Sequence, residues 1–238
     1  MKYAIVTIAL FAFAWLTPVK AQTPEGVAVE IVYDTSGSMG EKVLNSKGDP
    51  EPKYLIANRA ILQVLYRLED YSKSNPSKTI EVGLITFNNG DPKEVGHYSN
   101  NGVGKFTAYG IRKTILDFDN PGGGTPLGLS IDLAGDILLR SPLTHKHILM
   151  VTDGQNTVGP SPEAMLVDLQ KKCKLRAEAI DTHMIGLDVS RGSFNAVKPL
   201  VATLVEASNE KQLGTQFDFI LKQKILLEDE EPPTTGGK

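Results

Sequence analysis

Apolar segments rich in β-branched residues alternate with segments of helical periodicity along most of this chain, and this alternation limits the folds that the chain can adopt. Residues 27–33 form an almost continuous apolar run, which is typical of a strand covered on both faces. Runs of similar character occupy residues 79–87, 147–152 and 179–187, and a weaker one lies near 105–108. We expect all of these segments to be strands.

The segments between and after these runs have the spacing of amphipathic helices. Leu127, Ile131, Ala134 and Leu138, for example, follow one another at i, i+4, i+7 and i+11. Strands that alternate with helices form βαβ units, so we expect one α/β domain with a doubly wound, mainly parallel central sheet flanked by helices. The predicted helices are 54–68, 127–138, 162–177, 194–207 and 215–227.

The two ends of the sequence differ from its middle. Lys2, an apolar run of 13 residues at 4–16 and small residues near position 21 are typical of a signal peptide, whereas a membrane-spanning helix needs about 20 apolar residues. We therefore expect residues 1–21 to be a signal peptide and residues 22–227 to form the domain. Residues 228–238, with four acids followed by Pro-Pro and Gly-Gly, are interpreted as a flexible acidic tail.

Charge and cysteine content restrict the compartment and the partner. The 25 Lys and Arg residues against 28 Asp and Glu residues offer no basic stripe for phosphate groups, so we do not expect a nucleic-acid partner. Cys173 is the only cysteine, which excludes an intrachain disulfide and leaves stability to packing. We expect an exported protein, periplasmic or secreted and bacterial, with no membrane span after signal cleavage.

Short oxygen-bearing side chains gather at three loops of the predicted sheet. Asp34-x-Ser36-x-Ser38 follows the first strand, Thr125 stands in Gly-Gly-Gly-Thr-Pro before a helix, and Asp153 follows the strand at 147–152. Each motif alone suits a turn or a helix start. Ligands of open α/β sheets, however, bind at the carboxyl ends of the strands, and the coincidence of three such loops indicates one common site.

Together these residues resemble the metal-ion-dependent adhesion site of von Willebrand factor A domains, the fold also called the integrin I domain. All five positions match in order, and the likeness covers residues 27–227. The resemblance implies that Asp34, Ser36, Ser38 and Thr125 hold one divalent cation, with Asp153 close by or acting through water. The expected ion is Mg²⁺, with Mn²⁺ or Ca²⁺ as alternatives, since hard cations take oxygen ligands.

The same resemblance implies a protein-binding, adhesion-type function without catalysis. Because three of the five ligands are neutral hydroxyls, the cation stays attractive to an Asp or Glu carboxylate offered by a protein partner. The loop at 40–53 is longer than the family's usual passage into its first helix, and we expect it to modify which partner fits. Whether the last helix, predicted at 215–227, moves with the site stays an open hypothesis.

Two other functions stay open, a metal-dependent hydrolase and a structural scaffold with an unused site. Ser36 stands where an aspartyl-nucleophile phosphatase has its second Asp, no P-loop lysine follows Thr125, and Ser38 lacks the Gly-x-Ser-x-Gly context of a hydrolase. Cys173 is interpreted as a packed or idle thiol. The four histidines show no metal-ligand spacing and are interpreted as surface or strand-end residues; they are His97, His145, His147 and His183.

Overall fold

The computed structural model describes residues 25–87, 90–100, 107–190 and 192–226. The predicted signal peptide, residues 1–21, and the predicted tail, residues 228–238, lie outside the described residues. Within the described residues, no helix is both long enough and apolar enough to cross a bilayer.

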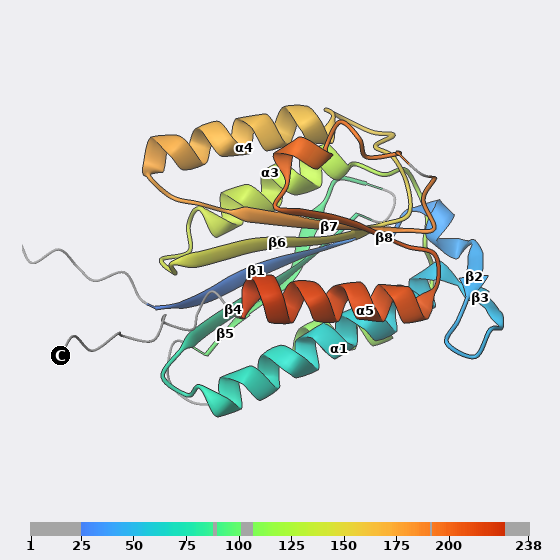
Figure 1. The fold of residues 1–238 in the computed structure, drawn as a ribbon, viewed down its shortest axis with the longest axis horizontal. Coiled ribbons are helices and arrows are strands. Elements are labelled where there is room, and N and C mark those ends of the chain that lie inside the picture. The colour runs from blue at the N-terminus through green and yellow to red at the C-terminus, as the bar shows by residue number, and fades with distance from the viewer. Residues whose placement is uncertain (1–24, 88–89, 101–106, 191, 227–238) are drawn as a thin grey trace, which may run out of the picture.

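A six-stranded sheet forms the centre of the molecule, in the order β5-β4-β1-β6-β7-β8 (Figure 1). Every neighbouring pair is parallel except β4 and β5, which are antiparallel. The predicted doubly wound, mainly parallel sheet is therefore confirmed. Its strands are β1 Gly26–Tyr33, β4 Thr79–Thr86, β5 Lys93–Ser99, β6 His145–Thr152, β7 Asp181–Leu187 and β8 Thr203–Ala207.

Helices cover both faces of this sheet, with α3 and α4 on one face and α1 and α5 on the other (Figure 1). The helices are α1 Lys53–Ser74, α2 Tyr109–Leu116, α3 Leu127–Leu138, α4 Pro162–Arg176 and α5 Glu210–Ile220, which continues as a π-helical segment, Leu221–Ile225. All eight residues of β1 are buried. Val29 and Ile31 pack in the core under α1 and α5, whereas Ala28 and Val32 pack under α3 and α4, which explains the continuous apolar run.

The sequence prediction is wrong for several elements. The helix predicted at 194–207 is instead a 3-10 turn, Lys198–Leu200, followed by β8, because pairing with β7 outweighs a helical spacing of apolar residues. The edge strand β5 and the short helix α2 were not predicted. Half of the weak strand predicted near 105–108 falls outside the described residues, and Thr107 and Ala108 are not in a strand. The last helix begins earlier than predicted, because the Asn209 side chain accepts a hydrogen bond from the backbone N–H of Gln212 and caps it.

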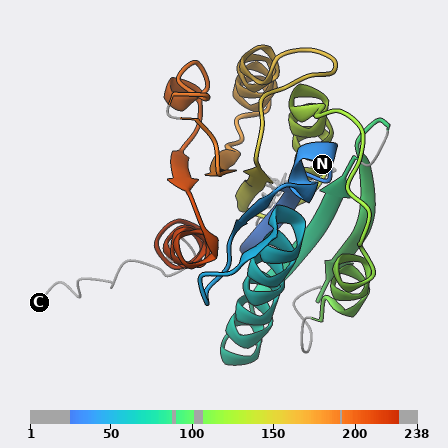
Figure 2. The same ribbon diagram turned by 90° about the vertical axis from the view of Figure 1, so that its right-hand side faces the viewer.

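The long loop at 40–53 is an ordered hairpin of β2, Lys42–Leu44, and β3, Pro50–Pro52. Figure 2, which looks at the molecule from the side where this hairpin lies, shows it between α1 and α5. Leu44 forms a bridge with Asn209, and the Ser46 N–H donates to the carboxylate of Glu210, 2.5 Å away. Arg59 of α1 bonds to both Glu51 and Glu210. The hairpin is thus tied to the start of α5.

Two of the four histidines are not at the surface, contrary to the sequence interpretation. His147 and His183 are each 1% exposed and stack with ring centroids 5.4 Å apart between neighbouring strands. Burial lowers the pKa of His147 to about 3 and that of His183 to about 4. Cys173 is buried in α4, and burial raises the pKa of its thiol, in agreement with an idle, packed side chain.

Candidate metal centre at the carboxyl ends of the strands

The first of the three predicted loops leaves β1 at the right-hand edge of the sheet in Figure 1. The Asp34 N–H donates to Val151 O at 3.0 Å, which prolongs the pairing of β1 with β6 by one residue. Asp34 is thereby fully buried. The chain then turns into a short 3-10 helix, Gly37–Gly40, which carries Ser38 outward.

A continuous series of polar contacts joins four of the five predicted residues. One carboxylate oxygen of Asp34 accepts from the Ser36 N–H at 2.8 Å, and the other accepts from the Thr152 hydroxyl at 2.5 Å. The hydroxyls of Ser36 and Ser38 lie 3.2 Å apart, and Ser38 Oγ donates to Asp153 Oδ1 at 2.7 Å. The structure therefore brings together side chains from two loops that are more than a hundred residues apart in sequence.

Thr125 follows a glycine loop that contacts the same region. The Gly37 N–H donates to Gly123 O at 3.2 Å, and the Gly122 N–H donates to Thr35 O at 2.9 Å, so the glycine loop lies against the loop that carries the serines. Thr125 itself is buried and bonds to Thr157 through its N–H and its carbonyl. In the described part of the chain, no hydrogen bond joins its hydroxyl to the other four predicted residues.

The cluster concentrates negative charge in a buried setting. Burial raises the pKa of Asp34, the hydrogen bonds from Ser36 and Thr152 oppose this, and the nearby Asp153 carboxylate adds to the rise. Two carboxylates and two or three hydroxyls within hydrogen-bond reach form a donor set of hard oxygens. Such a set fits Mg²⁺, which is bound through one or two carboxylates and retains several waters.

Sequence reasoning missed a lysine at this centre. Lys53, the first residue of α1, is 3% exposed, and its Nζ lies 3.0 Å from Asp153 Oδ2, 2.9 Å from Glu41 and 3.3 Å from Asp188. Burial disfavours its charged form, but the contacts with Glu41 and Asp153 outweigh burial and raise the pKa of Lys53. No pattern in the sequence singles out this residue, because the hairpin delivers it and Asp188 comes from the end of β7.

The two oxygens of Asp153 consequently face different groups. Oδ1 accepts from the Ser38 hydroxyl, while Oδ2 pairs with Lys53. Asp188 is the third carboxylate beside Lys53. Its backbone has the left-handed conformation, with a φ of 56°, which Asp tolerates better than most residues. Asp153 therefore has less negative charge to offer a metal ion than Asp34 does.

Several solved structures share the fold of this chain. No protein-family model and no curated protein sequence matches the chain. Among solved structures, the vWF domain of the type V pili tip protein Mfa5 from Porphyromonas gingivalis matches with a TM-score of 0.62 at 13% identity, over 90% of this chain and 99% of that one. The PilB minor pilin from Streptococcus sanguinis matches with a TM-score of 0.63 at 20% identity, over 93% of this chain and 65% of that one.

A third match is proximal thread matrix protein 1 from the mussel byssus, solved with a zinc-occupied MIDAS motif. Its TM-score is 0.58 at 15% identity, over 84% of this chain and 48% of that one. The chain thus spans about half of the mussel protein and 65% of the pilin, but nearly all of the Mfa5 vWF domain. At these identities the likeness shows the fold, a von Willebrand factor A-like sheet flanked by helices.

Proposed function

We propose that the chain is an exported, non-enzymatic binding module that holds one divalent cation on Asp34, Ser36, Ser38, Thr125 and Asp153. An Asp or Glu carboxylate of a protein partner would complete the coordination of that ion. The proposal includes a signal peptide at residues 1–21, one domain at 22–227 and an acidic tail at 228–238.

The observation that carries this proposal is the polar series from Asp34 to Asp153 at the carboxyl ends of β1 and β6. A bound Mg²⁺ would supply an electrophilic centre for an incoming carboxylate. The chain's own residues prepare that centre: the Thr152 hydroxyl and the Ser36 N–H hold the Asp34 carboxylate in one orientation. The bond between Ser38 and Asp153 fixes the spacing of the two loops.

The matching structures give further support, because they include a pilus tip domain, a minor pilin and a protein with a zinc-occupied MIDAS motif. A pilus adhesin from Lactobacillus rhamnosus GG, SpaC, also matches, with a TM-score of 0.57 at 14% identity. The names of these proteins, a pilus adhesin, a pilus tip protein and a minor pilin, refer to adhesion and pili and not to catalysis. We therefore favour binding over hydrolysis.

Isothermal titration calorimetry with Mg²⁺ tests the site. We expect one saturable ion per chain, and we expect Asp34→Ala to abolish binding, because Asp34 is the buried carboxylate at the centre of the series. Asp70→Ala, at an exposed carboxylate on α1, is the control and should bind the ion as the parent does. Unchanged ion binding in a folded Asp34→Ala protein would refute the assignment of the site.

A further inference from the structure

A glutamate interrupts the most buried strand of the molecule. Glu30 stands in the middle of β1, is 1% exposed, and faces the side of the sheet covered by α3, as its paired neighbour Ile148 does. Within the described residues, neither of its carboxylate oxygens receives a hydrogen bond. A buried carboxylate without hydrogen bonds is costly unless a cation lies beside it.

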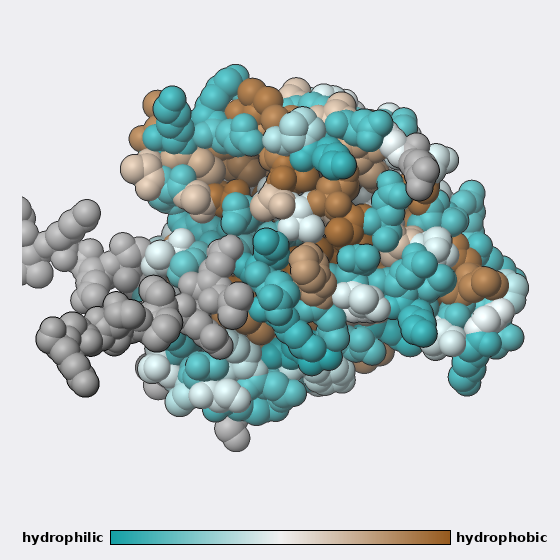
Figure 3. All heavy atoms as spheres, viewed as in Figure 1, coloured by the Kyte–Doolittle hydropathy of each residue, from teal (hydrophilic) through white to brown (hydrophobic). Residues whose placement is uncertain are grey.

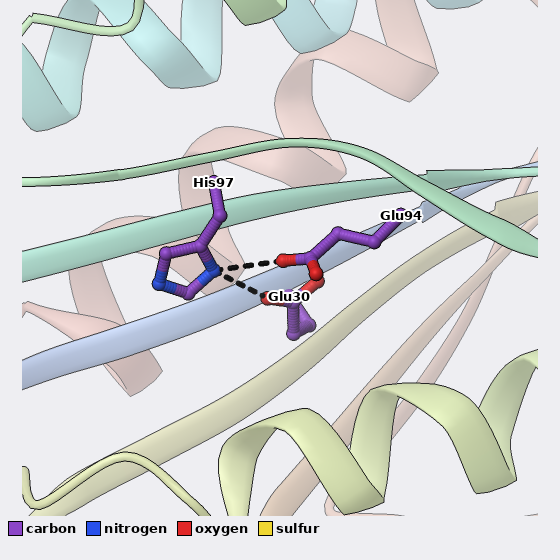
Figure 4. Close-up of side chains that lie close together, drawn as sticks. All are labelled: Glu30, Glu94 and His97. Carbon is purple, nitrogen blue, oxygen red and sulfur yellow. Dashed lines mark hydrogen bonds and ion pairs between the residues drawn. The ribbon is translucent and has the colours of Figure 1, made fainter.

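Two side chains of β5 point at this carboxylate (Figure 4). His97 Nδ1 lies 3.4 Å from Glu30 Oε1 and 2.8 Å from Glu94 Oε1. One ligand atom from each of Glu30, Glu94 and His97 can be chosen so that all three lie within 4.8 Å of one another. Figure 4 shows the ring nitrogen directed into the space between the two carboxylates.

Two local irregularities make this meeting possible. Residues 94 and 97, three apart, would face opposite sides of a regular strand. The register of β5 against β4 shifts between Leu84 and Ile85, which leaves Val95 as an extra residue and puts Glu94 on the same face as His97.

The second irregularity is Gly83 of β4, which lies between Glu30 and His97 and pairs with both. A Cβ there would come within 1.9 Å of a Glu30 oxygen. The missing side chain leaves the room in which Glu30 and His97 meet.

Two cavities, one small and one larger, adjoin the cluster of Glu30, Glu94 and His97. A cavity of about 10 Å³, close to the room that one water or ion needs, is lined by Glu30, Glu81 and His97 with residues of α3. A surface cavity of about 290 Å³ is lined by Glu81, Glu94 and His97 together with Arg140 and Ser141. The cluster therefore has an inner space of the right size and an entry path from solvent.

We propose that Glu30, Glu94 and His97 form a second metal site, which binds a divalent transition-metal ion of the zinc class and leaves one coordination position open to solvent. One imidazole nitrogen and two carboxylate oxygens suit Zn²⁺ better than Mg²⁺, which takes oxygen ligands. Tetrahedral Zn²⁺ with bonds of about 2.0–2.2 Å requires ligand atoms roughly 3.4 Å apart. The two contacts of His97, at 2.8 and 3.4 Å, lie close to this spacing, and the carboxylate oxygens of Glu30 and Glu94 lie within 4.8 Å of each other.

The site is independent of the first one. Glu30 precedes Asp34 by four residues of strand, roughly 13 Å at about 3.3 Å per residue, and its side chain meets β5 at the edge of the sheet instead of the strand ends. Without a metal ion, Glu30 and His97 form an ion pair with each other. Contact with Glu30 raises the pKa of His97 to about 9, while burial raises that of Glu30 to about 7. A bound ion would take the place of the proton on Nδ1.

Titration of the full chain with Co²⁺, followed by visible absorption, and with Zn²⁺, followed by calorimetry, tests this site. In the Asp34→Ala background, and in the parent with excess Mg²⁺, we expect one saturable ion per chain. His97→Gln should remove the imidazole ligand and its Co²⁺ spectrum. Glu94→Gln should weaken binding at least tenfold and keep the fold, because that side chain is 30% exposed.

Matched controls lie elsewhere on the sheet. Glu206→Gln, at an exposed glutamate on the opposite edge strand β8, and His145→Gln, at the start of β6, should leave the affinity unchanged. A simple Glu30–His97 ion pair predicts no saturable ion in either background, and that result would overturn the proposal. Binding that survives both His97→Gln and Glu94→Gln would overturn it equally. Mg²⁺ binding by His97→Gln reports on the first site alone, so failure of one site is distinguishable from failure of the other.

Discussion

At the scale of single residues, Asp153 divides its two carboxylate oxygens between the Ser38 hydroxyl and the Lys53 ammonium. Asp34, Ser36, Ser38 and Asp153 could be predicted to lie close together, because each follows a strand whose apolar run is easily recognised, and their contacts bear this out. Lys53 could not, since its burial depends on a hairpin and on Asp188 from another strand. His97 lies at the surface, as the sequence indicated, with 40% of its side chain exposed. Its contact with Glu30 could not be predicted, because neither the bulge beside it nor Glu30 across Gly83 leaves a readable spacing in the sequence.

Replacing Lys53 by Met should change metal binding and stability in opposite directions. Loss of the ammonium beside Asp153 removes a cation that competes with the metal, so we expect Mg²⁺ affinity to rise about tenfold, or about 1.4 kcal/mol. The metal-free protein should lose about 3 kcal/mol of unfolding free energy, since a buried carboxylate loses its partner. Calorimetry and urea denaturation with and without Mg²⁺ measure both. Lys73→Met, at an exposed ion pair on the same helix, should change neither.

At the scale of elements, the periodicity of apolar residues predicted the long, buried segments correctly but not the edge strands of the sheet. The helix α3 lies where its spacing placed it, and β1, β4, β6 and β7 follow the apolar runs within a few residues. The edge strands β5 and β8 were missed, because a strand with one neighbour keeps polar, exposed positions and its pairing depends on distant residues. In Figure 3 hydrophobic atoms gather between α4 and α5, over the β8 edge of the sheet.

The hairpin of β2 and β3 should restrain the start of α5. Arg59 joins Glu51 of the hairpin to Glu210 of the helix, and these contacts lower the pKa of both carboxylates. Because the Arg59 side chain is 42% exposed, we expect Arg59→Gln to cost less than about 1 kcal/mol of global stability. Hydrogen exchange should nevertheless quicken in the first turn of α5. Arg67→Gln, at a similarly exposed pair between α1 and Asp218, should leave that turn unchanged; equal quickening in both variants would contradict a tether.

At the scale of the whole molecule, the buried histidines make stability depend on acidity. In the unfolded chain a histidine titrates near 6.5, whereas burial holds the pKa of His147 at about 3 and that of His183 at about 4. Between these values the unfolded chain binds more protons than the folded one, so the unfolding free energy falls as pH is lowered. His97, with its pKa raised to about 9, contributes stability that is fully present below pH 6.5 and is lost as the pH rises from 6.5 to about 9.

Urea denaturation between pH 6.5 and 4.5 measures this dependence. We expect the parent to lose a few kcal/mol across that range, and the double variant His147→Gln, His183→Gln to lose distinctly less. Glu30, with its pKa raised to about 7, acts in the opposite direction but equally in both proteins, so it cancels in the comparison. Equal slopes in the parent and the double variant would show that these histidines are not the cause.

The extra residue in β5 has a consequence for how such a chain changes over generations. The extra residue Val95 determines the face of the sheet on which Glu94 lies. Loss of one residue at this point would therefore turn the Glu94 side chain away from Glu30, while every other amino acid stayed the same. A related chain could then keep all three letters, Glu, Glu and His, in an alignment and still lack the cluster. The length of this segment therefore matters as much as its composition. Deletion of a single codon would be enough to change a chain that has the cluster into one that lacks it.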